Sequence, residues 1–503
     1  MFVRKKVNKS GRISVQVIDK SSGRYHVVRT IGCSDQEALI NQYVRQGQQW
    51  IKNKSGAVEL DFKNYNSVIE GLLDGIISHK LVGVELTLGK VFDQIGFNQI
   101  EDDLFRHLVL YRLVYPRSKL KTTEYLYRYE QMTYSEDAIY RYMDKLHKVQ
   151  IELVQQISYK HTIQVMPQGI GVVFYDVTTI YFEIDRGDDL RKTGFSKEGK
   201  HQNPQIVLGL LVSKGGYPLA YQIFEGNKFE GHTMLPVVDC FKEKFNIDKL
   251  VIVADSGLMS KNNIHHMLKR GDEFILGARI KNEPEIIRKQ ILELNLENGQ
   301  SAQIEKGDLR LIINYSTQRA KKDQYNRDKG LKRLKKLIAT GKLSKSQLNK
   351  RGYNKFLQMD GQIDISIDQD KVDADKKWDG LKGYITNSSL STEELLVNYN
   401  HLWQIEKAFR IAKTELKIRP IYHYKQKRIE THICLNFAAY KVYKELERIL
   451  QDNNSVLSAQ KVIEIAQSIY QIQFQLPNNN SIYSKNILLL DEQKQVAKLF
   501  DFD

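Results

Sequence analysis

Three acidic residues, Asp176, Asp255 and Glu406, stand at positions where a carboxylate could do chemistry. Asp176 and Asp255 each follow an apolar run, GVVFY and LVIVA, that is typical of a buried strand. A carboxylate there either caps the next turn or projects a ligand at the rim of an α/β sheet. Capping is a strong alternative for Asp255, which Ser256 and Gly257 follow. After Asp176 the strand pattern continues as VTTIYF, and a carboxylate among apolar neighbours is costly unless it is paired or metal-bound.

Glu406 lies on a predicted helix that runs from 392 to about 416. Spacings of three and four residues, as on one helix face, connect Leu395, Tyr399, Leu402, Glu406, Phe409, Lys413 and Leu416. The pattern predicts that Glu406 and Lys413 point toward the sheet with the apolar residues. A carboxylate in that position needs a compensating charge, from a metal ion or from Lys413. A buried Glu406–Lys413 pair without a catalytic role is the alternative.

Three converging carboxylates suit Mg²⁺, a hard cation that prefers oxygen ligands and also recruits phosphate oxygens. Two such ions about 3.5 to 4 Å apart can activate a water or a 3′-hydroxyl and stabilise the leaving oxygen of a phosphodiester. The chemistry predicted from these residue types is therefore phosphodiester hydrolysis or transesterification.

A central block of strands and helices must position these carboxylates. Its order is three strands, helix, strand, helix and strand, which predicts an α/β fold with a sheet covered on both faces. The strands are GVVFYDVTTIYF, IVLGLLV, YPLAYQIF, KLVIVADSG and EFILGAR, the turn SKGG joins the second and third, and the helices are expected at 233–244 and 261–269. Further strands at 310–315, 363–367 and 383–386 and a basic helical segment then interrupt the order before the helix that carries Glu406.

The chain before this block divides into two parts. Residues 1 to about 56 read as a strand-strand-helix unit with its helix at 35–51, and 59–168 reads as helical and rich in aromatic residues. Segments 122–129 and 135–146 could form a helix-turn-helix, with Ser135 as N-cap and with Tyr140, Arg141 and Lys145 offered to DNA. An ordinary helical hairpin with its tyrosines in the core is the alternative.

The net charge of +16 is concentrated in two segments. Residues 1–30 carry +7 and residues 319–355 carry +12, so the rest of the chain sums to −3. Basic clusters on a nearly neutral body suit a polyanion, because each cation that meets a phosphate releases condensed counterions. A solvated helical face is the alternative explanation.

Length and composition exclude several classes of protein. At roughly 150 residues per domain, 503 residues make about three structural units. Apolar residues make up 41% and charged residues 27%, which indicates neither disorder nor a membrane protein; the longest apolar run is only Ile206 to Val212. Three distant cysteines and a start, MFVRKKVNKS, without an apolar signal favour a reducing cytoplasm.

The helix YNHLWQIEKAFRIAK resembles the signature helix of the IS-four-like superfamily of bacterial insertion-sequence DDE transposases. That signature has tyrosine, two residues, arginine, three residues, glutamate, six residues and lysine; Tyr399, Glu406 and Lys413 match it, whereas Leu402 replaces the arginine. FYDVTT and VADSG match the superfamily's two strand-end aspartates. The resemblance covers about 170 to 440, and the insertion YSTQRAKKDQYNRDKGLKRLKKL with the opening VRKKVNKSG narrows it to the IS-1634-like branch.

The resemblance implies an RNase H-like catalytic core, a mixed sheet with flanking helices, in which Asp176, Asp255 and Glu406 bind two Mg²⁺ ions, with Mn²⁺ as a substitute. It also implies that Tyr399 and Lys413 contact DNA phosphates near the cut.

Leu402 leaves one expected phosphate contact missing. Either a cation such as Arg410 or Lys417 replaces it, or this branch holds DNA differently. Trp403 could stack a base near the transposon end, and a core tryptophan is the alternative.

The expected organisation has six segments. They are a basic α+β unit at 1–58, a helical region with the helix-turn-helix candidate at 59–168, the first part of the RNase H-like core at 169–280, a basic insertion of strands and a helix at 281–388, the C-terminal core helices at 389–450 and a tail at 451–503.

The function expected is that of a transposase that binds the inverted ends of its element, cuts them and joins the 3′-hydroxyls to target DNA. Its expected partners are double-stranded DNA, as transposon ends and target, and a second copy of the chain in a synaptic homodimer, with no membrane; it would work in a bacterial cytoplasm, at the nucleoid when bound to DNA. The second basic cluster would grip DNA near the metal site through Lys332, Arg333, Lys335 and Lys336. A structure-selective nuclease of the same fold and a catalytically dead DNA-binding descendant are the alternatives.

Overall fold

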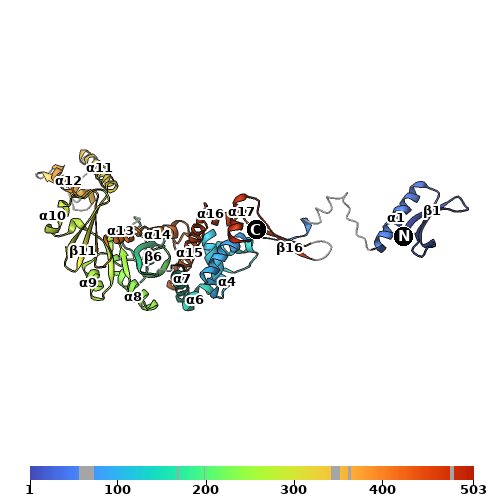
Figure 1. Ribbon diagram of the computed structural model, residues 1–503, viewed down its shortest axis with the longest axis horizontal. Coiled ribbons are helices and arrows are strands. Elements are labelled where there is room, and N and C mark those ends of the chain that lie inside the picture. Colours follow the sequence, from blue (N-terminus) through green and yellow to red (C-terminus); the bar gives the residue numbers. More distant parts are fainter. Residues whose placement is uncertain are drawn as a thin grey trace. The chain divides into compact units, whose positions relative to one another are not determined.

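The computed structural model describes residues 1–55, 73–166, 169–196, 199–340, 352–360, 364–475 and 481–502. The chain divides into two compact units, Met1–Ser78 with Gln473–Ser484, and His79–Ile472 with Lys485–Asp503 (Figure 1). Among the residues described, none of the helices combines the length and the apolar character needed to cross a membrane. Residues 341–351 of the basic segment predicted at 319–355 lie outside the described ranges.

The first unit contains a small antiparallel sheet and a helix. The strands β1 (Phe2–Val7), β2 (Ile13–Asp19) and β3 (His26–Ser34) pair in the order β1-β2-β3, and α1 (Glu37–Ser55) follows. The two expected strands and the helix are confirmed, and β1 adds a strand that the sequence reading missed. Apolar side chains of the central strand β2 and of α1 form the core, as Val15, Val17, Ile18 and Ile40.

The helical region of the second unit surrounds one long helix, α15 (Gln426–Asp452). Helices α3 (Lys90–Ile95), α4 (Asp103–Val114), α6 (Glu136–Val149) and α7 (Ile151–Val165) all pack against it. Being covered from several directions, α15 is buried along most of its middle. Ser135 caps α6 as expected, because its hydroxyl accepts from the Ala138 N–H at 3.1 Å. A shorter helix, α5 (Lys119–Tyr125), runs into a π-helical turn before α6.

The chain after α15 contains regular structure. It forms α16 (Ala459–Ala466), β15 (Tyr470–Gln475), β16 (Ile482–Ile487) and α17 (Asp491–Phe500). The strands β15 and β16 belong to a three-stranded sheet with β4 (Ile76–Leu81), in the order β16-β15-β4.

An eight-stranded mixed sheet is the centre of the second unit, which confirms the α/β class. Its order is β10-β11-β14-β9-β8-β5-β6-β7. The strands β5 (Val172–Tyr181), β6 (Gln205–Ser213), β7 (Pro218–Glu225), β8 (Val251–Ala254) and β9 (Glu273–Ala278) match the five predicted runs. β5, β8 and β9 are parallel, whereas β6 and β7 form the expected antiparallel hairpin.

Helices cover both faces of this sheet, so successive side chains of each inner strand enter different cores. Phe174 of β5 and Val253 of β8 belong to the core on the face of α15. Val173 and Ile252 belong to the other core, which includes residues of α8 (Met234–Phe245) and α9 (Lys261–Lys269). This double burial explains why the strands read as unbroken apolar runs rather than alternating ones.

The strands after β9 extend the same sheet. β14 (Leu381–Thr386) pairs with β9, β11 (Leu309–Tyr315) pairs with β14, and β10 (Ser301–Lys306) forms the edge. Between β11 and β14 lie the basic helix α11 (Thr317–Ala339), the two-stranded sheet of β12 (Leu357–Asp360) and β13 (Asp364–Ile367), and α12 (Gln369–Lys376). Ahead of β10 lies α10 (Glu285–Glu293).

An ion pair attaches α11 to the chain just before β14. The Arg327 guanidinium donates from Nη1 and Nη2 to the two carboxylate oxygens of Asp379, both at 2.6 Å, and Arg327 is only 4% exposed. We expect Asp379→Ala to lower the free energy of unfolding by about 2 kcal/mol, because the guanidinium loses its partner while it stays buried. Urea unfolding measures this change.

The matched control is Asp328→Ala, since Asp328 is exposed on the same helix and should change stability by less than about 0.5 kcal/mol. Equal effects of the two substitutions would contradict a specific role of the Arg327–Asp379 pair.

Candidate active site

The two predicted aspartates are register neighbours on adjacent parallel strands. Tyr175 pairs with Ala254, and Asp176 and Asp255 follow them directly. In a parallel pair such neighbours lie roughly 4.8 Å apart and point to the same face of the sheet. That face is the one on which Phe174 and Val253 are buried. The structure therefore brings Asp176 and Asp255 together at the carboxyl ends of two strands.

Each aspartate has a distinct local setting. Asp176 is half-buried, and β5 continues beyond it in antiparallel pairing with β6, as predicted. Asp255 is exposed and caps a short 3-10 turn, Ser256–Leu258, by accepting from the Ser256 N–H at 2.7 Å. The capping alternative for Asp255 is thus real. The capping hydrogen bond holds the Asp255 carboxylate at the rim of the sheet.

The predicted helix from 392 to 416 is broken into α13 (Thr392–Asn400) and α14 (Trp403–Thr414). A turn at His401 and Leu402 separates them. The break changes the phase of the apolar face, so α14 buries Ile405, Ala408, Phe409 and Ile411.

The prediction that Glu406 and Lys413 lie on the buried face was therefore wrong. Glu406 is exposed and Lys413 is half-buried. The alternative of a buried Glu406–Lys413 pair loses its premise, because Glu406 is in solvent. Since α14 packs on β5 and β6 and α13 packs on β8, Glu406 still belongs to the face that carries both aspartates.

Tyr399, at the end of α13, links that helix to Asp255. Its hydroxyl donates to Asp255 Oδ1 at 3.4 Å, and the residue is only 4% exposed. Its ring meets that of Tyr384 edge-on, with centroids 4.5 Å apart. Burial raises the pKa of the Tyr399 hydroxyl, and the negative charges of Asp255 and Glu406 raise it further. The hydroxyl therefore remains a proton donor to Asp255.

Lys382 is a site residue that the sequence reading missed. It lies on β14, and its Nζ is 4.5 Å from the centroid of the Tyr399 ring. Burial lowers the pKa of Lys382, as does Arg319, whereas the charges of Asp255 and Glu406 oppose that shift. Lys382 is thus a cation beside two of the three carboxylates. Only the pairing of β14 with β9 brings it there, and no local pattern in the sequence shows that pairing.

A basic cavity of about 680 Å³ adjoins this cluster, with Ser256 and Lys382 in its lining. Four of its cations have acidic partners: Lys281 and Lys355 bind Asp375, both at 2.7 Å, Arg327 binds Asp379, and Arg319 lies 3.6 Å from Asp323. Arg279 and Lys382 supply further positive charge to the lining. The cavity therefore offers a positive surface directly beside Asp255.

The other residues predicted to contact DNA have varied settings. Arg410 and Lys417 are exposed, and Trp403 is 50% exposed, so it is not a core tryptophan. Lys332, Arg333, Lys335 and Lys336 are all exposed on α11.

The helix-turn-helix candidate has fewer free groups than expected. On α6, the ring of Tyr140 lies under Arg428, 4.4 Å from the guanidinium carbon. Lys145 is bound to Asp102 at 2.8 Å, and Arg141 is exposed. Two of the three side chains expected to read DNA thus have partners within the protein.

A metal ion would find oxygen ligands at this site but no closed set of them. Within the described ranges, no three or more His, Cys, Asp and Glu side chains lie close enough together to hold a metal ion. Asp176 and Asp255 are nevertheless neighbours, and Glu406 lies near Asp255 through their shared neighbours Lys382 and Tyr399. An all-carboxylate set on one face is the donor chemistry that fits Mg²⁺.

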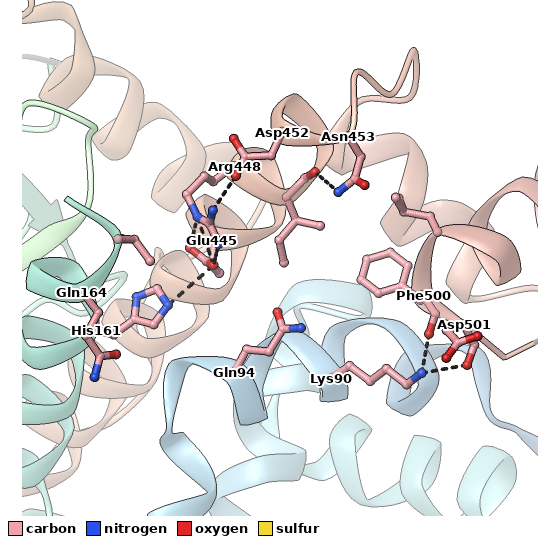
Figure 2. A pocket seen from close by; sticks show the side chains of 13 residues that line it. Lys90, Gln94, His161, Gln164, Glu445, Arg448, Asp452, Asn453, Phe500 and Asp501 are labelled. Carbon is pink, nitrogen blue, oxygen red and sulfur yellow. Dashed lines mark hydrogen bonds and ion pairs between the residues drawn. The ribbon is translucent and has the colours of Figure 1, made fainter. Parts of the chain in front are cut away.

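A second cavity, of about 590 Å³, is a structural cluster rather than an active site (Figure 2). Burial opposes the charge of Glu445, but hydrogen bonds from His161, Arg448 and Tyr217 lower its pKa to about 2. Figure 2 shows His161 and Arg448 directed at Glu445, and Lys90 directed at the backbone of Phe500 and Asp501. The charge of Glu445 is thus already satisfied within the protein.

The backbone of β9 approaches the Tyr399 hydroxyl so closely that only glycine fits at Gly277. An added Cβ would lie 2.6 Å from the Tyr399 oxygen and 3.0 Å from the Ser256 nitrogen. For the phosphodiester chemistry expected from the sequence, Gly277→Ala should displace Tyr399 and the Asp255 turn and slow cleavage about 100-fold, as misplaced catalytic groups do. A cleavage assay with Mg²⁺ measures this rate.

Gly171→Ala is the matched control, because an added Cβ there meets no atom within 4 Å. A Gly277→Ala protein that cleaves as fast as the Gly171→Ala protein would contradict the assigned role of this contact.

Comparison with known proteins identifies a family whose model matches this chain. The model of a family described as "Transposase DDE domain" matches residues 167–441. No curated protein matches the chain. Among solved structures, the chain is similar to a piggyBac transposase in a cryo-EM structure of its synaptic complex with hairpin DNA, with 9% sequence identity, coverage of 79% of each chain and a TM-score of 0.39.

Proposed function

The chain belongs to the transposase DDE domain family, and from this premise we propose that it is an insertion-sequence transposase that cuts and joins DNA through Asp176, Asp255 and Glu406. At the level of the family, the activity is DNA transposition by phosphoryl transfer. The observation that carries the finer proposal is the register of β5 and β8, which places Asp176 beside Asp255 on the face covered by α13 and α14. The helix motif of Tyr399, Glu406 and Lys413 supports the IS-four-like superfamily, and the insertion YSTQRAKKDQYNRDKGLKRLKKL with the opening VRKKVNKSG supports its IS-1634-like branch.

We propose that the three carboxylates hold Mg²⁺, with Mn²⁺ as a substitute. When bound, such ions activate the attacking oxygen and stabilise the leaving oxygen of the phosphodiester. Asp176 and Asp255 would supply ligands from the rigid sheet, and Glu406 would supply one from the exposed first turn of α14. Lys382 limits the repulsion between Asp255 and Glu406. The Tyr399 hydroxyl keeps Asp255 in one orientation through the hydrogen bond that it donates.

DNA would lie over the basic surface beside the carboxylates. The cavity lined by Arg279, Arg319 and Lys382 and the exposed cations of α11 offer positive charge there. Trp403, Arg410 and Lys417 are accessible on or just after α14, so each is available to a DNA strand. Tyr399 is better placed to orient Asp255 than to bind a phosphate, because it is buried.

The proposed substrates are the inverted terminal repeats of an insertion sequence and a target DNA. Because two ends must be joined to one target, we propose a homodimer as the active assembly. In this proposal the protein acts on bacterial chromosomal DNA in the cytoplasm, and the cations of the first unit, such as Arg4, Lys5 and Lys6, assist end binding.

Removing any one proposed metal ligand tests the assignment. We expect Asp176→Asn, Asp255→Asn and Glu406→Gln each to reduce Mg²⁺-dependent end cleavage and strand transfer by about 1,000-fold or more, because metal-bound oxygens carry most of the catalysis. Binding of an end oligonucleotide should persist. Glu415→Gln, near the end of the same helical segment, is the control and should cleave normally.

Cleavage that survives in any of the three variants would remove that residue from the proposed site. Cleavage without joining of linear ends in the wild-type protein would instead identify a nuclease. No cleavage of an authentic end by the wild-type protein, with binding intact, would identify a catalytically dead descendant.

The role of α11 is tested by salt dependence. Reversing Lys332, Arg333, Lys335 and Lys336 to glutamate should flatten the slope of log affinity against log salt concentration, because each lost phosphate contact removes about 0.9 from the slope. Fluorescence anisotropy on end DNA measures this slope. Four reversals at the exposed residues Lys148, Lys249, Lys261 and Lys269 are the matched control. Identical slopes for both proteins would leave α11 outside the DNA-binding surface.

A further inference from the structure

A third cavity, of about 500 Å³, lies away from the three carboxylates and carries a strong excess of positive charge. It is formed by the end of α4, by α5 and α6, by the segment that follows α14, and by α15. Its cationic lining residues are Arg112, Arg117, Lys119, Lys121, Lys417 and Arg419. Among the described residues that line it, only Glu136 is acidic.

Two of these cations are buried without an acidic partner. Arg112 is 6% exposed and Lys119 is 4% exposed. The Nε of Arg112 is buried and makes no hydrogen bond, and within the described part of the chain no carboxylate forms an ion pair with Arg112 or Lys119. Nδ1 of His432, another lining residue, is likewise buried without a partner. Unpaired donors of Arg112 and Lys119 thus face the cavity from α4 and α5, whereas His432 of α15 donates from Nε2 to the Ile418 carbonyl.

The other buried cations within the described ranges have partners. Arg327 is bound by Asp379, and Lys444 by Glu447 at 2.7 Å. Lys441 donates to the Ser158 carbonyl and to the Thr162 hydroxyl. Arg112 and Lys119 differ from these residues, because both line one cavity and neither has an acidic partner. A buried cation without a counter-charge is strongly destabilising, so the missing partner should be an anion from outside the chain.

The electrostatics of the cavity agree with this inference. Burial lowers the pKa of Arg112 to about 10. Burial also lowers the pKa of Lys119 far below its usual range, and the positive charge of Arg112 adds to that shift. A bound anion would reverse both effects, because it favours the charged form of each group.

We propose that this cavity binds a phosphate group, with Arg112 and Lys119 at its base and Arg117 at its exposed rim. Guanidinium and ammonium donors from several directions suit the oxygens of a phosphate. A cavity of this volume also has room for more than the phosphate itself, such as an attached nucleoside. The phosphate could belong to a DNA strand or to a free phosphate compound. The site does not depend on the proposed transposition, since none of Asp176, Asp255 and Glu406 lines it.

Thermal unfolding of the full chain tests the proposal. Inorganic phosphate, titrated against chloride at constant ionic strength, should raise the Tm of the wild-type protein. Lys119→Met should raise the Tm in phosphate-free buffer, because it removes an unpaired buried cation, and should weaken phosphate binding at least about tenfold. Lys148→Met, at an exposed lysine outside the cavity, should change neither quantity.

Arg117→Gln supplies a second variant that leaves the buried residues intact, because Arg117 is exposed. We expect it to weaken phosphate binding by a smaller factor without a change in Tm, and exposed Arg128→Gln to have no effect. Wild-type protein that phosphate does not stabilise, or an Arg117→Gln or Lys119→Met protein that responds to phosphate as the wild type does, would overturn the proposal.

DNA oligonucleotides with and without a 5′-phosphate distinguish the two sources. If Lys119→Met weakens binding of oligonucleotides as well as of inorganic phosphate, the group belongs to DNA, and a loss confined to the 5′-phosphorylated form places the strand end in the cavity. If it weakens inorganic phosphate alone, the ligand is a free phosphate compound. Either result supports the phosphate site.

Discussion

The parallel pairing of β5 with β8 is the constraint on which the site depends. Hydrogen bonds fix the register, so Asp176 and Asp255 cannot drift apart without breaking the middle of an eight-stranded sheet. Apolar cores on both faces hold that sheet, which makes the positions of the two aspartates a property of the whole fold. The third carboxylate has a weaker anchor, because Glu406 is exposed on a helix that packs across the sheet. Two ligand positions are therefore rigid and one is adjustable.

The way in which buried and clustered charges are compensated is a second feature of the structure. Where a cation is buried for structural reasons, the chain supplies acceptors for it, as Asp379 does for Arg327 and the Ser158 carbonyl for Lys441. Near the carboxylates the reverse holds, and Lys382 supplies a cation to a site that is otherwise acidic. Arg112 and Lys119 follow neither pattern, which distinguishes their cavity from the self-satisfied cluster around Glu445.

The sequence was sufficient to predict the inner strands, the β6–β7 hairpin and the helices α8 and α9, because double burial produces unbroken apolar runs and clear turns. It was insufficient for features that depend on contacts between parts of the chain that are far apart in the sequence. The stripe through Leu402 continued at helical spacing, so the break at His401 and Leu402 left no signal in periodicity. Lys382 and Gly277 could not be found either, because their roles follow from strand pairing and from the close approach of Tyr399.

The attachment of β14 to β9 also limits how this protein can vary. After β9 the chain forms α10, adds β10 and β11 to the sheet, forms α11 and α12, and then places β14 between β11 and β9, where it supplies Lys382 and Tyr384 beside Tyr399. The intervening segment is therefore not a module that could be removed or exchanged as a unit. Natural variation in its length should be confined to the stretch between β11 and β14, while both strands and the residues between Trp378 and Tyr384 keep their place in the sheet.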